Sequence, residues 1–572
     1  MTSILKEINI PYGESNFEMI RQDNYLYVDK THFIRQIERT KRVLYLRPRR
    51  FGKSLFISTL ECYYDIHRAD KFDELFKGLY IHEHPTASRN HYYVLRFNFS
   101  GIQTTNIETI NRGFLTAVQS ALKVFVRKYG FDISLTKNAM EPATILREVL
   151  GELEASELQH KVCILIDEYD HFTNAVLSEG LDGFMTLITR GGMVRSFYEV
   201  IKIKYEQGVV GRFFMTGVMS VSLDNMTSGF NIATNITTEP AHADMMGFSE
   251  NEVKRLLVQC ELTKDEQTEI YDIFKQNYNG YLFSEESDTK VFNSTLIMYY
   301  LSHYIVKKRP PKSLIDPNLN QSGTTIQTIV DLKNREANYA AVEEIVLNKQ
   351  ISGELSTFID VDKKYDEYDF ITLMFNIGLL TIKKSGFQTV FEIPNKITEV
   401  IYLKYLAEMV PKKNDYTIGI SAQKKALSEM GEHGKIKTLT RLVSDFLAHL
   451  SVRNTINFDE KYIKLIYMML LSATEQYFVY DEFPARQGYT DLIILKTPNS
   501  YAKHEYLIEL KYIKKSEMKK NAIPEARIEK AFLEGVQQIN DYMQDKRMVN
   551  RPNLKKFVIV FLGFEVVKLG EV

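Results

Sequence analysis

The sequence predicts an α/β protein, and three patterns carry that prediction. An apolar run, a basic glycine-containing loop and an apolar-periodic segment follow one another over residues 43–60, as a strand, a loop and a helix would. Further apolar runs alternate with helical periodicity as far as residue 217, which indicates a parallel sheet with helices on both faces. Near the C-terminus, two β-rich runs flank a turn with proline, asparagine and serine, which predicts an antiparallel hairpin.

The length of the chain predicts several domains. A chain of 572 residues is long enough for more than one hydrophobic core. We place the domains at 1–246, 247–410 and 418–572, because strands give way to helices after Gly247 and a polar, helix-breaking segment occupies 411–415.

Composition and charge narrow the functional classes. The 72 Lys and Arg residues balance the 73 Asp and Glu residues, so any nucleic-acid surface has to be local. Cys62, Cys163 and Cys260 lack C-x-x-C spacing and are expected to be reduced core residues. No leader-like start and no run of about eighteen apolar residues occurs, so we expect a soluble, cytoplasmic protein without a membrane partner.

The loop of the first pattern carries the end of a phosphate-binding P-loop. Gly52 lets the backbone approach a phosphate, Lys53 suits the β- and γ-phosphates, and Ser54 can hold Mg²⁺ at a helix N-terminus. The full pattern has glycine where this chain has Arg47, and Pro48 removes one N–H donor. Taken alone, the motif also fits a basic surface turn.

A second stretch, residues 162–170, ends an apolar strand in carboxylates. A buried parallel strand delivers such acids to the carboxyl edge of its sheet. There Asp167 can hold the Mg²⁺ of a nucleotide, and Glu168 can polarise the attacking water. The alternative is a helix cap or a solvated rim, which the preceding G-K-S makes less attractive.

These motifs carry a resemblance to a known family. R-P-R-R-F-G-K-S-L, preceded by Y-L-Y-V-D-K-T and followed by I-D-E-Y-D and F-M-T-G-V, resembles the bacterial AAA-ATPase-like family that is often fused to a PD-(D/E)xK nuclease-like domain. The resemblance implies a P-loop NTPase sheet, and it implies that Arg47 and Pro48 belong to the family's own version of the loop. It implies bound ATP and Mg²⁺, with Thr216 as the sensor of the γ-phosphate. The implied nucleotide contacts are Arg49, Arg50, Phe51, Gly52, Lys53, Ser54, Leu55, Asp167 and Thr216, with Ser54 and Asp167 on the metal.

The middle of the chain is predicted to form a helical and winged lid. Capping boxes at Ser249 and Thr263 each open an apolar-periodic helix. A helix and short strands around 370–394 resemble a winged helix, which can bind DNA or only pack. Upstream, Arg190 or Arg195 could serve as an arginine finger, although arginine on a helix surface is commoner.

The C-terminal hairpin is the second candidate site. Strand periodicity puts Glu509 and Lys511 on one face, and the hairpin can bring Asp491 beside them. Two carboxylates can hold a hard cation, with the Leu510 carbonyl as a further oxygen, while Lys511 orients water and offsets transition-state charge. The alternative is the charged face of an ordinary hairpin, but unpaired charges are costly in so apolar a strand.

This arrangement resembles the PD-(D/E)xK nuclease fold. The resemblance implies an α/β restriction-endonuclease-like domain that uses Mg²⁺ or Mn²⁺, flanked by Glu482 and by the helix at 537–542. Relatives often have Gly-Arg-x-Asp where this chain has Gly488-Tyr489-Thr490-Asp491, a difference that concerns substrate contacts. A local basic cluster with interleaved tyrosines accompanies the hairpin and could bind nucleic acid: Lys503, Lys511, Lys514, Lys515, Lys519 and Lys520.

Together these patterns predict an Mg²⁺-dependent ATPase joined through a lid to a nuclease-like domain that acts on nucleic acid, in bacterial defence against foreign genetic elements. The catalytic residues would be Glu168, Asp491, Glu509 and Lys511. A first alternative is a regulatory nucleotide switch whose C-terminal domain is an inactive binding module. A second is a binding protein with both sites degenerate. The sequence does not distinguish DNA from RNA as the substrate or endonuclease from exonuclease activity. It also leaves open whether the chain forms a homo-oligomer.

Overall fold

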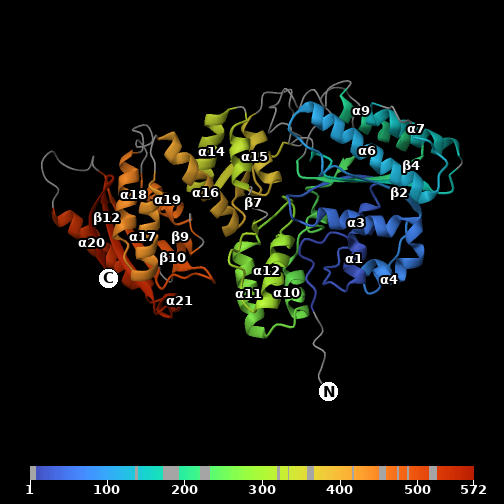
Figure 1. Cartoon of the computed structure of the whole chain (residues 1–572). Coiled ribbons are helices and arrows are strands. Elements are labelled where there is room, and N and C mark those ends of the chain that lie inside the picture. Colours follow the sequence, from blue (N-terminus) through green and yellow to red (C-terminus); the bar gives the residue numbers. More distant parts are fainter. Residues whose placement is uncertain are drawn as a thin grey trace, which may run out of the picture. The chain divides into compact units, whose positions relative to one another are not determined.

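The computed structural model describes residues 8–135, 140–156, 158–171, 192–219, 232–317, 322–332, 334–356, 366–414, 418–449, 459–472, 474, 476–485, 488–514 and 525–572. The chain forms two compact units. The first unit comprises 1–309, 328–341 and 350–398, and the second comprises 310–327, 342–349 and 399–572. Figure 1 shows their elements.

A parallel five-stranded sheet forms the centre of the first unit. The strand order is β2-β3-β4-β1-β5, so β4 separates the strand that precedes the G-K-S loop from the strand that ends in Asp167. The predicted parallel sheet is confirmed. The strands are β1 (Arg42–Leu46), β2 (Tyr92–Asn98), β3 (Lys161–Asp167), β4 (Val210–Gly217) and β5 (Thr234–Asn235).

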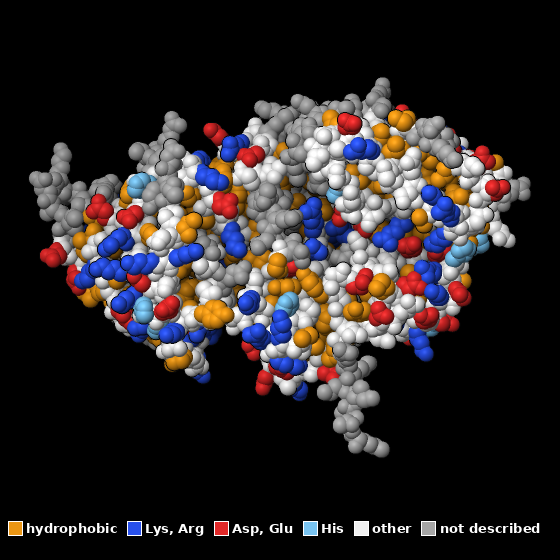
Figure 2. All heavy atoms as spheres, viewed as in Figure 1, with side chains coloured by type: hydrophobic (Ala, Val, Ile, Leu, Met, Phe, Trp, Pro, Cys, Tyr) orange, Lys and Arg blue, Asp and Glu red, His pale blue; other side chains and the backbone are white. Residues whose placement is uncertain are grey.

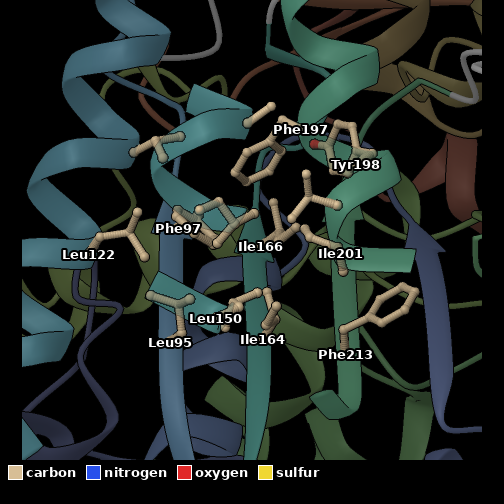
Figure 3. Packing of buried hydrophobic residues seen from close by; sticks show 14 of the residues in the cluster. Leu95, Phe97, Leu122, Leu150, Ile164, Ile166, Phe197, Tyr198, Ile201 and Phe213 are labelled. Atoms are coloured by element: carbon tan, nitrogen blue, oxygen red, sulfur yellow. The ribbon is translucent and has the colours of Figure 1, made fainter. Parts of the chain in front are cut away.

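Helices cover both faces of this sheet (Figure 1). On one face, α6 (Ile107–Tyr129), α7 (Pro142–Ala155) and α9 (Met193–Glu206) pack their apolar sides on β2, β3 and β4. Figure 3 shows this core, in which the Phe97 and Phe197 rings meet edge to face. On the other face lies α3 (Lys53–Tyr64). The smaller elements near α3 are α1 (Phe17–Gln22), α2 (His32–Ile37), η1 (Ile66–Lys71), α4 (Phe72–Phe76) and α5 (Tyr80–Glu83).

The helical segment after Gly247 begins as predicted. Ser249 and Thr263 form capping boxes on α10 (Glu250–Gln259) and α11 (Lys264–Asn277), and Asn293 caps α12 (Ser294–Lys307). The wing is a three-stranded antiparallel sheet in the order β6-β8-β7. The remaining elements of this region are η3 (Pro240–His242), α13 (Ser322–Val330), α14 (Arg335–Asn348), β6 (Gln350–Gly353), α15 (Glu367–Asn376), β7 (Thr381–Lys384) and β8 (Thr389–Glu392).

A mixed sheet in the order β13-β12-β11-β10-β9 forms the second unit. The predicted hairpin is confirmed, because β10 (Gly488–Lys496) and β11 (Glu505–Ile513) pair antiparallel. Strand β12 (Leu554–Leu562) then pairs parallel to β11 after the crossover helix α20 (Glu525–Tyr542). The other elements are α16 (Lys396–Lys413), α17 (Ile420–His433), α18 (Lys437–His449), α19 (Glu460–Ser472), α21 (Lys546–Val549), β9 (Tyr477–Ala485) and β13 (Glu565–Glu571).

Three expectations about the chain's course can be compared with this fold. Helix α16 continues through Pro411 to Lys413, so the expected break at 411–415 begins later; Pro411 lacks one N–H donor of the helical ladder, and the helix ends two residues after it. Cys62, Cys163 and Cys260 are buried and free, as predicted. No helix in the described part of the chain has the length and apolarity that crossing a membrane requires.

Candidate active sites

The G-K-S loop lies between β1 and α3 and has the backbone of an anion-binding loop. Gly52 stands at the N-cap of α3 with φ of 93°, and Arg50 has φ of 72°. Left-handed residues of this kind turn successive N–H groups toward one side, and the helix N-terminus adds its positive dipole end. Figure 1 shows α3 beginning beside the sheet that it covers. The loop can therefore hold a phosphate through its backbone.

Arg47, which stands in place of the expected glycine, has a structural role. Its buried guanidinium donates hydrogen bonds to the carbonyls of Leu46 and Thr237 at 2.8 Å and to those of His242 and Ala243 at 3.1 Å. It also lies 4.2 Å from the ring centroids of Tyr45 and Phe283. The side chain thus fixes the start of the loop to the segment that follows β5.

The other loop residues divide between packing and exposure. The Phe51 ring is buried against Tyr281 and Phe283, so it anchors the loop and contacts no phosphate with its side chain. Its carbonyl accepts from the Gly247 N–H at 3.0 Å. Arg49 and Arg50 are exposed, whereas Leu55 is partly buried on α3. Among these four residues, Arg49 and Arg50 have exposed side chains that can contact a ligand bound at the loop.

The side chain of Lys53 makes hydrogen bonds to the backbone of its own loop. Its ammonium donates to the carbonyls of Arg47 at 3.0 Å and Pro48 at 2.9 Å. Burial lowers the pKa of Lys53 to about 8, although Asp170, Asp167 and Glu168 act to raise it. Phosphate oxygens are stronger acceptors than these two carbonyls, so Lys53 is suited to exchange them for a nucleotide.

Asp167 lies at the end of β3 with the Ser54 hydroxyl beside it. Burial raises the pKa of Asp167, while a hydrogen bond from Ser54 and the charge of Lys53 act to lower it. Its Oδ1 is buried without a hydrogen-bond partner. A buried, unpaired carboxylate oxygen next to a hydroxyl fits Mg²⁺, which would be held by Ser54 and Asp167.

Glu168 is held by a residue that the motif analysis missed. It has φ of 51°, and its Oε2 lies 3.1 Å from His171 Nδ1, while His171 Nε2 lies 2.9 Å from the Ile102 carbonyl. Both ring nitrogens therefore face acceptors, which favours the doubly protonated ring. The hydrogen bond from His171 lowers the pKa of Glu168. Burial acts to lower the pKa of His171, but the bonds to Glu168 and Ile102 outweigh it and raise that pKa.

Asp170 and Gly217 form a second contact that the sequence did not reveal. Asp170 Oδ2 accepts from the N–H groups of Val218 at 2.9 Å and Met219 at 2.6 Å. A Cβ at Gly217 would lie 2.1 Å from Asp170 Oδ1, so a side chain there would displace the carboxylate. The signal available in the sequence is the Y-D pair shortly after β3 and the T-G pair that ends β4.

The structure places the predicted sensor and finger residues as follows. The Thr216 hydroxyl is buried and donates to the Tyr45 carbonyl at 2.7 Å, so it bonds within the sheet, and its role toward a phosphate stays a prediction. Arg195 bonds Glu199 on its own helix at 2.9 Å. Arg190 lies outside the described residues.

The hairpin brings together the three residues of the second site. Leu492 pairs with Ile508 in the antiparallel hairpin, so the adjacent pair of opposite residues is Asp491 and Glu509. Asp491 Oδ2 accepts from the Leu510 N–H at 2.8 Å, and the Lys511 ammonium lies 2.8 Å from Glu509 Oε1. The side chains of Asp491, Glu509 and Lys511 thus meet on one face, as the strand pattern predicts.

Glu509 is the most perturbed carboxylate of this site. Burial, followed by the charge of Asp491, raises the pKa of Glu509 to about 8, and its Oε2 is buried without a partner. A divalent cation would relieve both the repulsion and the missing bond, so the donor set fits Mg²⁺ or Mn²⁺ held by Asp491 and Glu509. Within the described residues, no group of three or more His, Cys, Asp or Glu side chains is arranged to hold a metal ion.

Helix α19 adds two charged residues that the sequence analysis did not single out. The Lys464 ammonium lies 2.8 Å from Asp491 Oδ1 and 3.1 Å from Glu460 Oε1. Burial, followed by the charge of Asp491, raises the pKa of Glu460 to about 7. The signal available in the sequence is a Glu and a Lys four residues apart at the start of an otherwise apolar helix.

The flanking elements lie partly outside the described residues. On α20, the Tyr542 hydroxyl donates to the Tyr489 carbonyl at 2.8 Å, and burial followed by the charge of Glu509 raises the pKa of Tyr542 to about 12. The side chain of Glu482 is not described, nor are residues 515–520 of the predicted basic cluster. Lys503 lies in the turn before β11 and is separated from Lys511 by most of that strand.

Comparison with known proteins identifies both regions. Residues 11–227 match the family model of a predicted AAA-ATPase. Residues 458–571 match the model of the PD-(D/E)XK nuclease superfamily, and that range includes Glu460 and Lys464 as well as the hairpin. The predicted fusion is confirmed. An uncharacterized protein from the 5′ region of vnfD in Azotobacter chroococcum mcd 1 is 27% identical over 415 residues, which cover 70% of this chain and 71% of the relative.

Proposed function

We propose that the first unit binds and hydrolyses ATP with Mg²⁺ and that the second unit cleaves phosphodiester bonds in nucleic acid with Mg²⁺ or Mn²⁺. In each unit, the region that matches a family model contains carboxylates at strand positions and a lysine close to them. This observation carries the proposal. We place this activity in the bacterial cytoplasm, in defence against foreign genetic elements, a role that rests on the family resemblance alone.

In the ATPase-like unit, the chain supplies binding and orientation. The Gly52 loop and the first turn of α3 bind phosphates through N–H groups, and Lys53 adds a positive charge at the β- and γ-phosphates. Ser54 and Asp167 would hold Mg²⁺, which would supply positive charge to offset that of the phosphates. Glu168, positioned by His171, orients the attacking water and accepts its proton.

In the nuclease-like unit, a divalent cation held by Asp491 and Glu509 would polarise the scissile phosphate and lower the pKa of a water. Lys511 lies beside this pair and can orient the water and stabilise charge that develops on the phosphate.

A basic surface on the second unit supports nucleic acid as the partner. Lys503 and the exposed Tyr501 lie in the β10–β11 turn, and the Lys503 N–H donates to the carbonyl of Gly431, near the end of α17, at 2.7 Å. The exposed side chains of Lys435 and Lys437 follow, between α17 and the first residue of α18. No ion pair between described residues neutralises these three lysines. Figure 2 shows the Lys and Arg side chains that gather over α17 and α18. Cations beside an exposed aromatic ring suit a phosphate backbone and an unstacked base.

The ATPase half is tested by calorimetry with ATP and Mg²⁺. Lys53→Ala should weaken nucleotide binding about a hundredfold, because the variant loses a charge-assisted contact to phosphate. Glu168→Gln should bind ATP normally and lose hydrolysis by about a hundredfold or more. If Lys53→Ala binds as well as the parent, the nucleotide site is elsewhere.

The nuclease half is tested on single-stranded DNA, double-stranded DNA and RNA with Mn²⁺, using the full chain with and without ATP. Asp491→Ala should abolish both metal-induced thermal stabilisation and cleavage. Lys511→Ala should keep the stabilisation and lose most of the rate, because lysine is assigned to water and to transition-state charge. An EDTA-treated sample is the control.

A second candidate function is the regulatory switch, in which the second unit only binds. The observation that favours it is that protein groups already bond both oxygens of Asp491. If ATP turns over normally while no metal binds at Asp491 and no substrate is cleaved, the switch replaces the nuclease.

A further inference from the structure

The contacts of Lys464 distinguish it from the lysine of the E-x-K motif. Lys511 bonds Glu509, whereas Lys464 comes from α19 and bonds Asp491 Oδ1 at 2.8 Å and Glu460 Oε1 at 3.1 Å. The Lys464 side chain is only 13% exposed and that of Asp491 14%, so this ion pair is shielded from solvent. The pair is therefore stronger than a surface salt bridge.

Both oxygens of Asp491 already have a donor within the protein. Oδ2 accepts from the Leu510 N–H, and Oδ1 accepts from Lys464. A divalent cation needs direct access to a carboxylate oxygen, and Oδ2 is bonded to the backbone of the neighbouring strand. A metal ion at Oδ1 would lie close to the Lys464 ammonium, so the two positive charges compete for Asp491.

We propose that Lys464 is a built-in competitor of the divalent cation at Asp491. Its ammonium neutralises Asp491 and links α19 to β10, and it is displaced toward Glu460 when a metal ion binds. Glu460 already bonds Lys464, so it offers the displaced ammonium an acceptor on the same helix. The inference rests on the proposed metal site but concerns its affinity, not the cleavage reaction.

A variant that neutralises Lys464 should differ from most variants that lose a salt bridge. Removal of a salt bridge normally weakens a site, but neutralising Lys464 should tighten metal binding, because the cation then meets less positive charge and a free carboxylate oxygen. A unit charge a few ångströms away changes the affinity of a buried site by about tenfold or more. The metal-free variant should in turn be less stable, because the two carboxylates lose their counter-ion.

The experiment measures Mn²⁺ and Mg²⁺ binding to the full chain without nucleotide, by calorimetry. Heat that disappears in Asp491→Asn is assigned to this site. Lys464→Gln should bind Mn²⁺ about tenfold more tightly than the parent, and Lys464→Arg, which keeps the charge, should not. Lys461→Gln is the matched control, because it removes an equal charge from an exposed position on the same helix. Circular dichroism verifies that each variant is folded.

The outcomes separate this inference from the proposed function. Binding by Lys464→Gln alone, with no detectable binding by the parent, supports the inference in its strongest form. If the parent binds metal through Asp491 and Lys464→Gln binds no more tightly, the lysine does not compete and only the inference fails. If neither protein binds metal, both the inference and the metal site fail. Equal tightening in Lys461→Gln shows a general charge effect and also overturns the inference.

Discussion

The buried Lys53 in the first unit and the largely shielded Lys464 in the second both lie near acidic strand positions, but their ammonium groups bond different partners. Lys53 donates to two backbone carbonyls of its own loop, and Lys464 bonds the carboxylate that is the candidate metal ligand. In the first unit, Asp167, Glu168 and Asp170 each have their own surroundings, respectively Ser54, His171 and the Val218–Met219 backbone.

The difference teaches that the two sites are held together by different forces. In the first unit, the buried Arg47 and Phe51 fix the loop, and the exposed Arg49 and Arg50 are separate from them, although Lys53 also bonds the loop backbone. In the second unit, the charged residues of the site are also its cross-links between α19, β10 and β11. Mutations should therefore separate stability from ligand binding in the first site and combine them in the second.

The largest expected effect comes from the loop arginines. Arg47→Leu removes a donor from four buried carbonyls, of which that of His242 keeps the Tyr45 hydroxyl, and should destabilise the first unit by about 3 kcal/mol or more, measured by denaturant unfolding. Arg49→Leu, two positions later and exposed, should leave stability unchanged and weaken ATP binding. If Arg49→Leu destabilises the unit as strongly as Arg47→Leu does, the separation of roles is wrong.

A smaller effect is expected at His171, whose ring is faced by Glu168, Asp170 and the Ile102 carbonyl. The pKa of His171 is raised and that of Glu168 is lowered. Their bond therefore contributes its full stabilisation between the pKa values that the two groups have in the unfolded chain, at about pH 4.5 to 6.5. It is lost as pH rises through the folded pKa of His171, and Glu168 is then released toward water.

The ATP turnover number should accordingly fall as pH rises above about 6.5 in the parent, because Glu168 loses the contact that positions it. His171→Gln should have a lower turnover number and should remove most of this fall, while ATP binding stays unchanged. A parallel pH profile in both proteins would contradict the assignment of His171 as a positioning residue.

The smallest effect is expected on the basic surface. Lys435→Gln combined with Lys437→Gln should reduce the slope of log affinity against log salt by about two and weaken all nucleic-acid sequences alike. Lys412→Gln with Lys461→Gln removes the same charge from other exposed positions of the second unit and serves as control. Fluorescence anisotropy at several salt concentrations measures the slope for each double variant. If the two slopes are equal, this surface is not part of the nucleic-acid interface.

Local patterns predicted the parts of the fold that depend on nearby residues. The capping boxes at Ser249 and Thr263, the long helix at 107–129 and the hairpin with Asp491 opposite Glu509 all follow from short-range periodicity. Thr31 shows the limit of local patterns, because a threonine directly before a helix is a common N-cap. Its hydroxyl instead donates to Asp29 and accepts from the Ile81 N–H, and it does not cap α2.

The residues that sequence reasoning missed act across long separations. Arg47 finds its carbonyls about 190 positions away, at Thr237 to Ala243. His171 reaches Ile102, and Lys464 reaches Asp491, each from a different element. No spacing rule encodes such pairs, because tertiary packing alone decides which buried charge meets which partner. The chemistry-bearing motifs could be read from the sequence, but the groups that restrain them could not.

The division of the chain into units affects how its parts can be exchanged. The chain passes from one unit to the other at 309/310, 327/328, 341/342, 349/350 and 398/399. Within the second unit, Asn499 donates to the carbonyls of Pro310 and Pro311, and Lys349 pairs with Glu399 and Asp481. A fragment that starts near residue 418 would lose all these partners. We therefore expect that an exchange of the nuclease-like region yields a folded protein only when it carries the interleaved segments 310–327 and 342–349 with it.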